Sequence, residues 1–167
     1  MLRVWMVDDN ASLRGLFGKL LDGKSNLSCT RGFGSGEEIL TTLKEERPPD
    51  VILLDINLGE ESGLDLIRPI KKLAPTVKIL MFTMFRNVHY ASEAFHAGAN
   101  GFLIKTYEPG DIVRLIRAAC DQTETTGLFP AHLPAAAEKP AKPPQTPAPR
   151  PGMFRSLSRW VCASATR

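Results

Sequence analysis

The sequence lacks the features that mark disulfide-rich, zinc-stabilised and membrane-spanning proteins. Its three cysteines, Cys29, Cys120 and Cys162, are widely spaced and form no CxxC or Cys/His cluster, so neither a disulfide framework nor a structural zinc site is expected. No apolar run approaches the ~18–20 residues that a transmembrane helix needs. The first residues also lack the charged and apolar regions of a signal peptide. We therefore expect a cytoplasmic protein with no membrane span.

Charge and proline content divide the chain into unequal parts. Residues 128–167 contain six basic residues and one acid, whereas the rest of the chain is mildly acidic, and eight prolines lie between Pro130 and Pro151. Such a stretch is typical of an extended linker. We predict a globular domain over residues 1–124, a Pro/Ala-rich linker over 125–152 and a short basic aromatic segment over 153–167.

Short apolar runs alternate with segments of helical periodicity. The expected strands are 2–7, 27–33, 50–56, 77–83 and 101–104, and the expected helices are 11–23, 35–47, 63–73, 88–99 and 109–120. The almost continuous apolar run at 50–56 is typical of a strand buried on both faces of a parallel sheet. The repeats predict an α/β fold, a five-stranded doubly wound parallel sheet of flavodoxin-like order 2-1-3-4-5, with helices on both faces.

Polar residues stand where the predicted strands end. They follow four different strands, and they are Asp8, Asp9, Asp55, Thr83 and Lys105. The carboxyl ends of parallel strands lie at one edge of a sheet, so these side chains should converge. Carboxylates within ~4 Å of one another repel by several kcal/mol, and Mg²⁺, a hard cation that binds oxygen, would relieve that repulsion. With Lys105 as a point charge and Thr83 as a hydroxyl donor, the cluster suits phosphoryl transfer to Asp55.

The stretches around these residues resemble the motifs of bacterial response-regulator receiver domains. They are MVDDN, VILLDINL with Gly63 eight residues after Asp55, MFTM and GFLIKT, and in order and spacing they cover about residues 2–121. The resemblance is greatest to the group that usually carries a C-terminal helix-turn-helix. Residues 128–167 have neither the length nor the periodicity of that module, so sequence-specific DNA binding is not expected.

The resemblance also implies a role for each site residue. Asp55 would be the phosphoacceptor, and Thr83 and Lys105 would grip the phosphoryl group. Asp9 and Asp55 would bind Mg²⁺ directly, Asp8 would act through water, and the backbone carbonyl of Asn57 would be a further ligand. Phe102 would be the aromatic switch. Gly59 stands where the family often has Pro, which predicts a loop after the phosphoacceptor that is looser or differently shaped.

The function implied is that of a response regulator in a two-component phosphorelay. A sensor histidine kinase or phosphotransfer protein would donate the phosphoryl group, and the phosphorylated domain would present a changed surface to a downstream protein. A homodimer is compatible with the sequence. The protein would phosphorylate itself and slowly lose the group, rather than act as an enzyme.

Two alternatives remain open. One is a binding module that works without phosphorylation. The other is a Mg²⁺-dependent aspartyl phosphohydrolase, although such enzymes need a second acid two residues after the nucleophile, where this chain has Asn57. The role of residues 128–167 also stays open, between a solvated extension and a docking element.

Overall fold

The structure of the chain is a computed structural model that describes residues 1–21 and 26–121. The predicted linker over 125–152 and the predicted segment over 153–167 lie outside the described residues. Within them, helices and strands follow one another in this order: β1 (Leu2–Val7), α1 (Ala11–Leu21), β2 (Leu27–Phe33), α2 (Gly36–Glu45), β3 (Val51–Leu54), β4 (Asn57–Leu58), β5 (Glu61–Ser62), α3 (Gly63–Leu73), β6 (Lys78–Thr83), α4 (Val88–Ala97), β7 (Gly101–Ile104) and α5 (Pro109–Asp121).

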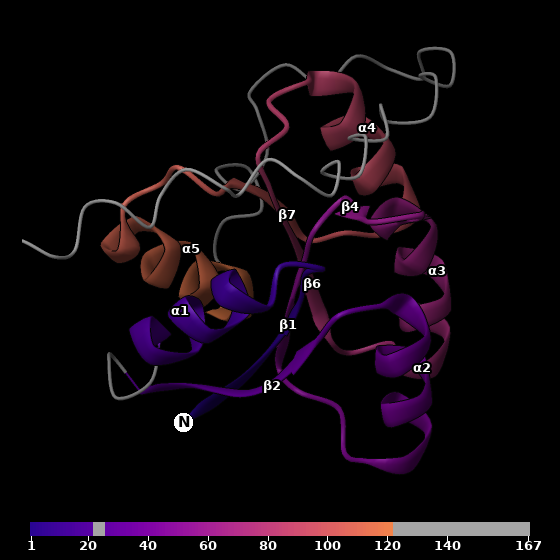
Figure 1. The fold of residues 1–167 in the computed structure, drawn as a ribbon, viewed down its shortest axis with the longest axis horizontal. Helices are drawn as coiled ribbons and strands as arrows, with labels where there is room; N and C mark the ends of the chain where they lie inside the picture. Colours follow the sequence, from indigo (N-terminus) through magenta and orange to yellow (C-terminus); the bar gives the residue numbers. More distant parts are fainter. Residues whose placement is uncertain (22–25, 122–167) are drawn as a thin grey trace, which may run out of the picture.

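A five-stranded parallel sheet forms the middle layer of the domain. Its strand order is β2-β1-β3-β6-β7, which is the predicted 2-1-3-4-5 once the strands of this sheet alone are counted. Helices α1 and α5 cover one face, and α2, α3 and α4 cover the other (Figure 1). The predicted fold class is therefore confirmed.

The alternation of side chains along each strand builds two cores. On β1, Trp5 and Val7 pack into the cluster beneath α2, α3 and α4, while Val4 and Met6 pack into the cluster beneath α1 and α5. Successive side chains of a strand point to opposite faces, so a central strand of a three-layer fold must be apolar throughout. This explains the unbroken apolar run of β3, whose residues are all buried.

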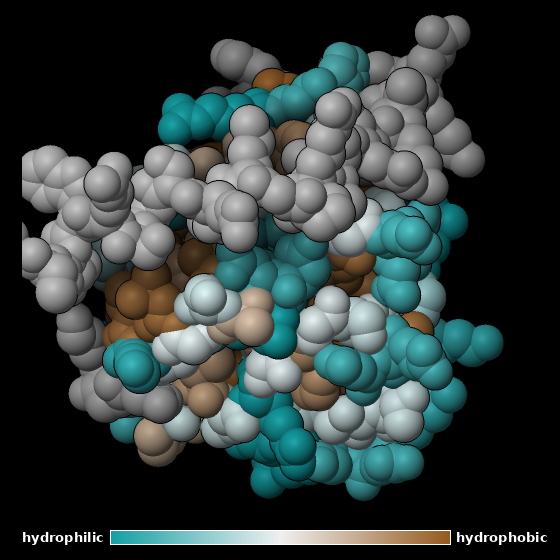
Figure 2. Space-filling model, viewed as in Figure 1, coloured by the Kyte–Doolittle hydropathy of each residue, from teal (hydrophilic) through white to brown (hydrophobic). Residues whose placement is uncertain are grey.

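Helix α1 departs from its predicted pattern. The three- and four-residue spacing of Leu13, Leu16, Phe17, Leu20 and Leu21 predicts a single inner face, but Leu16 is 58% exposed whereas Phe17 and Leu21 are buried. Hydrophobic surface is visible over α1 and α5 in Figure 2. None of the helices in the described part of the chain is long and apolar enough to cross a membrane.

The turn between α3 and β6 is held by a polar contact at the opposite end of the sheet from the acidic residues. Asn100 Oδ1 accepts hydrogen bonds from Lys71 Nζ at 2.9 Å and from the backbone N–H of Ile79 at 3.1 Å. Lys71 Nζ also donates to the carbonyl of Val77 at 2.7 Å. Burial, together with the nearby charge of Lys78, lowers the pKa of Lys71 below its ordinary value. Because burial disfavours the charged ammonium, the two oxygens that accept its hydrogen bonds contribute to the stability of the fold.

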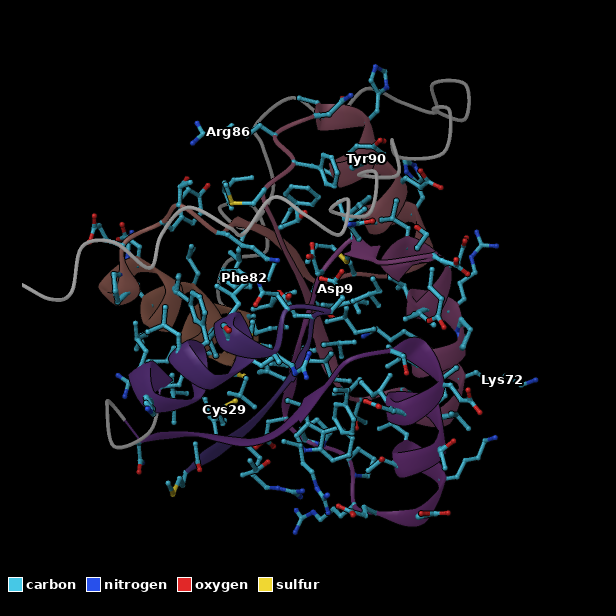
Figure 3. The ribbon with its side chains drawn as sticks, viewed as in Figure 1. Asp9, Cys29, Lys72, Phe82, Arg86 and Tyr90 are labelled. Carbon is cyan, nitrogen blue, oxygen red and sulfur yellow. The ribbon has the colours of Figure 1, made fainter. Side chains whose placement is uncertain are left out.

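Removing this acceptor should cost stability. Asn100→Ala leaves the buried N–H of Ile79 and the ammonium of Lys71 without a shared partner, and we expect the free energy of unfolding to fall by about 1–3 kcal/mol. The control is Lys72→Ala, whose side chain points away from α3 into solvent (Figure 3) and should change it by less than about 0.5 kcal/mol. Urea denaturation measures both; equal losses would contradict the role of Asn100.

Candidate functional site

The sheet itself brings the strand-end residues together. The backbone N–H of Asp55 donates to the carbonyl of Val7 at 2.9 Å, and the N–H of Lys105 donates to the carbonyl of Thr83 at 2.9 Å. These bonds continue the parallel ladders one residue beyond the strands. The predicted convergence of residues from β1, β3, β6 and β7 on one edge is therefore present in the structure.

Lys105 bridges two buried carboxylates. Its Nζ lies 2.6 Å from Asp55 Oδ2 and 2.7 Å from Asp8 Oδ2, and the side chains of Lys105, Asp55 and Asp8 are only 9%, 8% and 1% exposed. The ring of Phe82, which Figure 3 labels beside this edge, has its centroid 6.0 Å from Nζ. A single ammonium group thus forms ion pairs with two carboxylates in a poorly hydrated place.

Burial and the neighbouring charges shift both ionisable partners. Burial, aided by the charge of Asp8, raises the pKa of Asp55, although the Lys105 ammonium and the Thr83 hydroxyl oppose that rise. Burial alone would lower the pKa of Lys105, but the carboxylates of Asp55 and Asp8 more than offset it and raise that pKa. Lys105 therefore stays protonated.

The three acids form a set of hard oxygen donors. One carboxylate oxygen from each of Asp8, Asp9 and Asp55 lies within 4.8 Å of the other two. Hard oxygen donors of this kind are the ligands that Mg²⁺ prefers. Asp8 Oδ2 is buried and has the ammonium of Lys105 as its partner, whereas Asp9 is exposed. The donor set fits a hard divalent cation.

The backbone of Asp8 is held from two sides. Its N–H donates to the carbonyl of Phe33 at 3.0 Å, and its carbonyl accepts from the guanidinium of Arg14 at 2.5 Å. Sequence reasoning missed Arg14. An added Cβ at Gly32 would lie 3.3 Å from Arg14 Cδ, so glycine at this position of β2 leaves room for the arginine.

Helix α1 is capped by Asn10 and not by Asp8 or Asp9. Asn10 Oδ1 accepts from the N–H of Leu13 at 3.1 Å, while Asp8 Oδ1 accepts from the N–H of Asn10 at 2.9 Å. Asn10 therefore caps the helix. The carboxylate of Asp9 is left free of that task.

The remaining predicted residues lie around the cluster. Thr83 is fully buried and Phe102 is 5% exposed on β7, packed into the core beneath α4. Asn57 is half-buried at the start of β4. The role of Phe102 as a switch and that of the Asn57 carbonyl as a metal ligand stay predictions.

Gly63 approaches the backbone of Asp55 too closely for any other residue. A Cβ at this position would lie 1.8 Å from the carbonyl oxygen of Asp55, and the N–H of Gly63 donates to the carbonyl of Ile56 at 2.7 Å. The glycine of the sequence motif thus closes the loop that follows the candidate phosphoacceptor.

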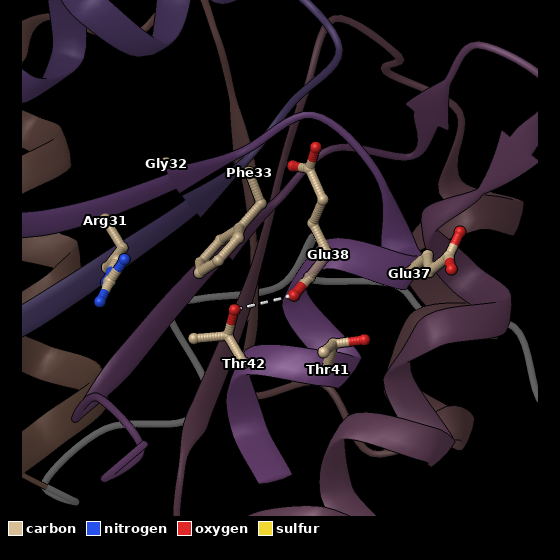
Figure 4. A pocket seen from close by; sticks show the side chains of 7 residues that line it. All are labelled: Arg31, Gly32, Phe33, Glu37, Glu38, Thr41 and Thr42. Carbon is tan, nitrogen blue, oxygen red and sulfur yellow. Dashed lines mark hydrogen bonds between the residues drawn. The ribbon is translucent and has the colours of Figure 1, made fainter. Parts of the chain in front are cut away.

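A separate pocket lies between β2 and α2. It is an open groove of about 480 Å³, lined by Arg31, Gly32, Phe33, Glu37, Glu38, Thr41 and Thr42 (Figure 4). The hydrogen bond drawn there, from Thr42 Oγ1 to the carbonyl of Glu38, is internal to α2. None of the predicted site residues lines this groove, and its side chains do not converge as a catalytic set.

Comparison with known proteins agrees with this geometry. Residues 4–117 match the family described as response regulator receiver domain. The transcriptional regulatory protein YxjL of Bacillus subtilis is 31% identical over 118 residues, which are 71% of this chain and 54% of YxjL. The chain therefore spans about half the length of that relative.

Solved structures share the fold. A LuxR-family two-component response regulator from Aurantimonas sp. SI85-9A1 superposes with a TM-score of 0.68 at 26% identity, covering 73% of this chain and 86% of that one. A response regulator from Burkholderia pseudomallei, solved with a phosphorylated aspartic acid, calcium ion and citrate, gives 0.65 at 28% identity, with 76% and 70% covered.

The close contact at Gly63 allows a matched pair of variants. Gly63→Ala should lower the free energy of unfolding by about 2–3 kcal/mol, because the new methyl group must displace the backbone of Asp55. Gly15→Ala, in open space on α1, should leave it unchanged or raise it by up to about 1 kcal/mol. Chemical denaturation compares the two, and a Gly63→Ala protein as stable as the wild type would contradict the packing described.

Proposed function

The chain belongs to the response regulator receiver domain family of two-component signalling, and on that premise we propose that Asp55 accepts a phosphoryl group in a Mg²⁺-dependent reaction. The observation that carries the proposal is the bridge of Lys105 between Asp55 and Asp8, beside the exposed carboxylate of Asp9. The donor would be a sensor histidine kinase or a phosphotransfer protein in the cytoplasm.

The three acids would contribute to cation binding in different ways. Asp9 and Asp55 would bind Mg²⁺ directly, Asp8 would act through water, and the backbone carbonyl of Asn57 would complete the protein ligands. The ion would neutralise charge on the phosphoryl oxygens during transfer. The phosphorylated aspartic acid and calcium ion of the Burkholderia pseudomallei regulator support this assignment by analogy.

The chain's own residues would supply both the nucleophile and the groups that bind the phosphoryl oxygens. A carboxylate oxygen of Asp55 forms the bond to phosphorus while the bond from phosphorus to the donor breaks, and the leaving group departs with that electron pair. The ammonium of Lys105 and the hydroxyl of Thr83 would then contact the phosphoryl oxygens. Lys105 Nζ already lies 2.6 Å from Asp55 Oδ2. Only a small movement would therefore bring its ammonium into contact with an oxygen of the phosphoryl group on Asp55.

The phosphorylated domain would signal through its surface. Thr83 precedes the loop to α4, and Phe102 lies on the neighbouring strand β7. A shift of Thr83 toward the phosphoryl group would open space that Phe102 fills. The change would reach the surface of α4, β7 and α5, where Phe95 and Tyr107 are 48% and 41% exposed. A downstream protein, or a second copy of the chain, would bind there.

The rival functions fit the site less well. A phosphohydrolase needs an acid two residues after the nucleophile, and Asn57 cannot transfer a proton there. We therefore propose a phosphoacceptor that loses its phosphoryl group slowly rather than an enzyme that turns over. A binding module independent of phosphorylation would have no need for three crowded acids and a bridging lysine.

Mass measurement with a small phosphodonor tests the proposal. The wild-type chain incubated with Mg²⁺ and acetyl phosphate should gain the mass of one phosphoryl group, and it should gain none when Mg²⁺ is chelated. Asp55→Asn should gain none, because the amide is not a nucleophile. The matched control is Asp65→Asn, on the exposed side of α3, which should be phosphorylated like the wild type.

Three outcomes would contradict the proposal. An adduct in Asp55→Asn would place the phosphoacceptor elsewhere. No adduct in the wild type would favour the binding module. Steady release of many equivalents of phosphate from phosphoesters would favour the hydrolase.

A further inference from the structure

The loop after Asp55 forms a short antiparallel hairpin. Strands β4 and β5 pair antiparallel, with Asn57 opposite Ser62 and Leu58 opposite Glu61. Gly59, the first of the two turn residues, has φ +73°, as in a type II′ turn, where glycine is favoured. A two-stranded hairpin of this size is not stable alone, so its position must be set by contacts outside it.

Two contacts hold the base and the inner side of the hairpin. The N–H of Gly63 donates to the carbonyl of Ile56 at 2.7 Å and closes its base. Leu58 is 5% exposed and packs into the core beneath α2, α3 and α4. Neither contact reaches the outer strand, β5.

A third contact ties β5 to another helix. Glu61 Oε2 accepts a hydrogen bond at 2.8 Å from the backbone N–H of Gly36, the first residue of α2. That N–H has no partner within its own helix, and the positive end of the helix dipole favours a carboxylate there. Glycine at position 36 leaves room for this contact, because an added Cβ would lie 2.5 Å from Glu61 Oε2 and 2.5 Å from Leu66 Cδ2, and both side chains would have to move.

We propose that Glu61 is a positioning residue for the cation site, which it serves by anchoring the hairpin that carries Asn57 to the first turn of α2. The inference rests on the proposed function, because only there does the carbonyl of Asn57 become a metal ligand. Asn57 pairs with Ser62, next to Glu61, so a hairpin released from α2 would let that carbonyl drift away from Asp55.

A purely structural role for Glu61 predicts something different. If its carboxylate only stabilised α2, its loss would lower the stability of the domain and leave cation binding unchanged. If it positions the hairpin, cation affinity changes while global stability changes little, because the two cores do not include the contact.

The test compares Glu61→Ala, Glu61→Gln and Glu60→Ala in the full chain. Glu60 is the exposed neighbour in the turn and serves as the matched control. Hydrogen exchange of the Gly36 amide, followed by NMR, measures whether its hydrogen bond to Glu61 is intact. Calorimetric titration measures the affinity for Mg²⁺, and urea denaturation measures the free energy of unfolding.

In Glu61→Ala, the Gly36 amide should exchange about tenfold faster, since it loses one hydrogen bond. The dissociation constant for Mg²⁺ should rise about tenfold, at the low end of the effect of outer-shell partners. The midpoint of urea unfolding should stay close to that of Glu60→Ala. Glu61→Gln keeps an oxygen acceptor and should restore most of the Mg²⁺ affinity.

The failures are distinguishable. A wild-type chain that binds no Mg²⁺ would overturn both this inference and the proposed function. Mg²⁺ binding that is equal in the wild type and in Glu61→Ala would overturn only the role of Glu61. An equal loss of affinity in Glu61→Gln and Glu61→Ala would assign the effect to net charge and overturn positioning.

Discussion

The site depends on negative charge that the fold crowds into one edge of the sheet. Asp8 and Asp55 are buried there and share the ammonium of Lys105 at 2.7 Å and 2.6 Å, with the carboxylate of Asp9 beside them. Two buried carboxylates share one ammonium, and the exposed carboxylate of Asp9 adds negative charge beside them, an arrangement that is costly unless a cation joins it. In the proposed function, this excess of negative charge is what would favour the binding of Mg²⁺ before a phosphoryl group.

Much of the surrounding backbone serves to keep these carboxylates in place. The carbonyl of Asp8 is held by Arg14, and Gly63 permits the close approach behind Asp55. Glu61 ties the next loop to α2. Each contact comes from a different element packed around the edge, so the geometry of the site is a property of the whole domain and not of one loop.

Sequence reasoning could predict the fold because its signals are periodic and its strands are parallel. The apolar runs located the strands of the main sheet to within a few residues, and parallel order then forced Asp55, Thr83 and Lys105 to one edge. The β4–β5 hairpin was missed because strands of two residues carry no periodicity. Arg14 and Glu61 were missed because each reaches across to another element, and the spacing of residues along the chain does not encode such a contact. Leu16 was misplaced because a helical pattern cannot tell a covered face from one that has no neighbour.

The central claim is that Lys105 and a divalent cation share the same carboxylates. It is tested most directly by the unfolding free energy of Lys105→Met and of the wild type, each measured with a chelator and with saturating Mg²⁺, with Lys72→Met as the control. Loss of the ammonium should make the chelated variant less stable than the wild type. Mg²⁺ should then stabilise the variant by more than it stabilises the wild type, since it no longer competes with a positive charge. An equal gain in both proteins, or no gain in either, would contradict the account.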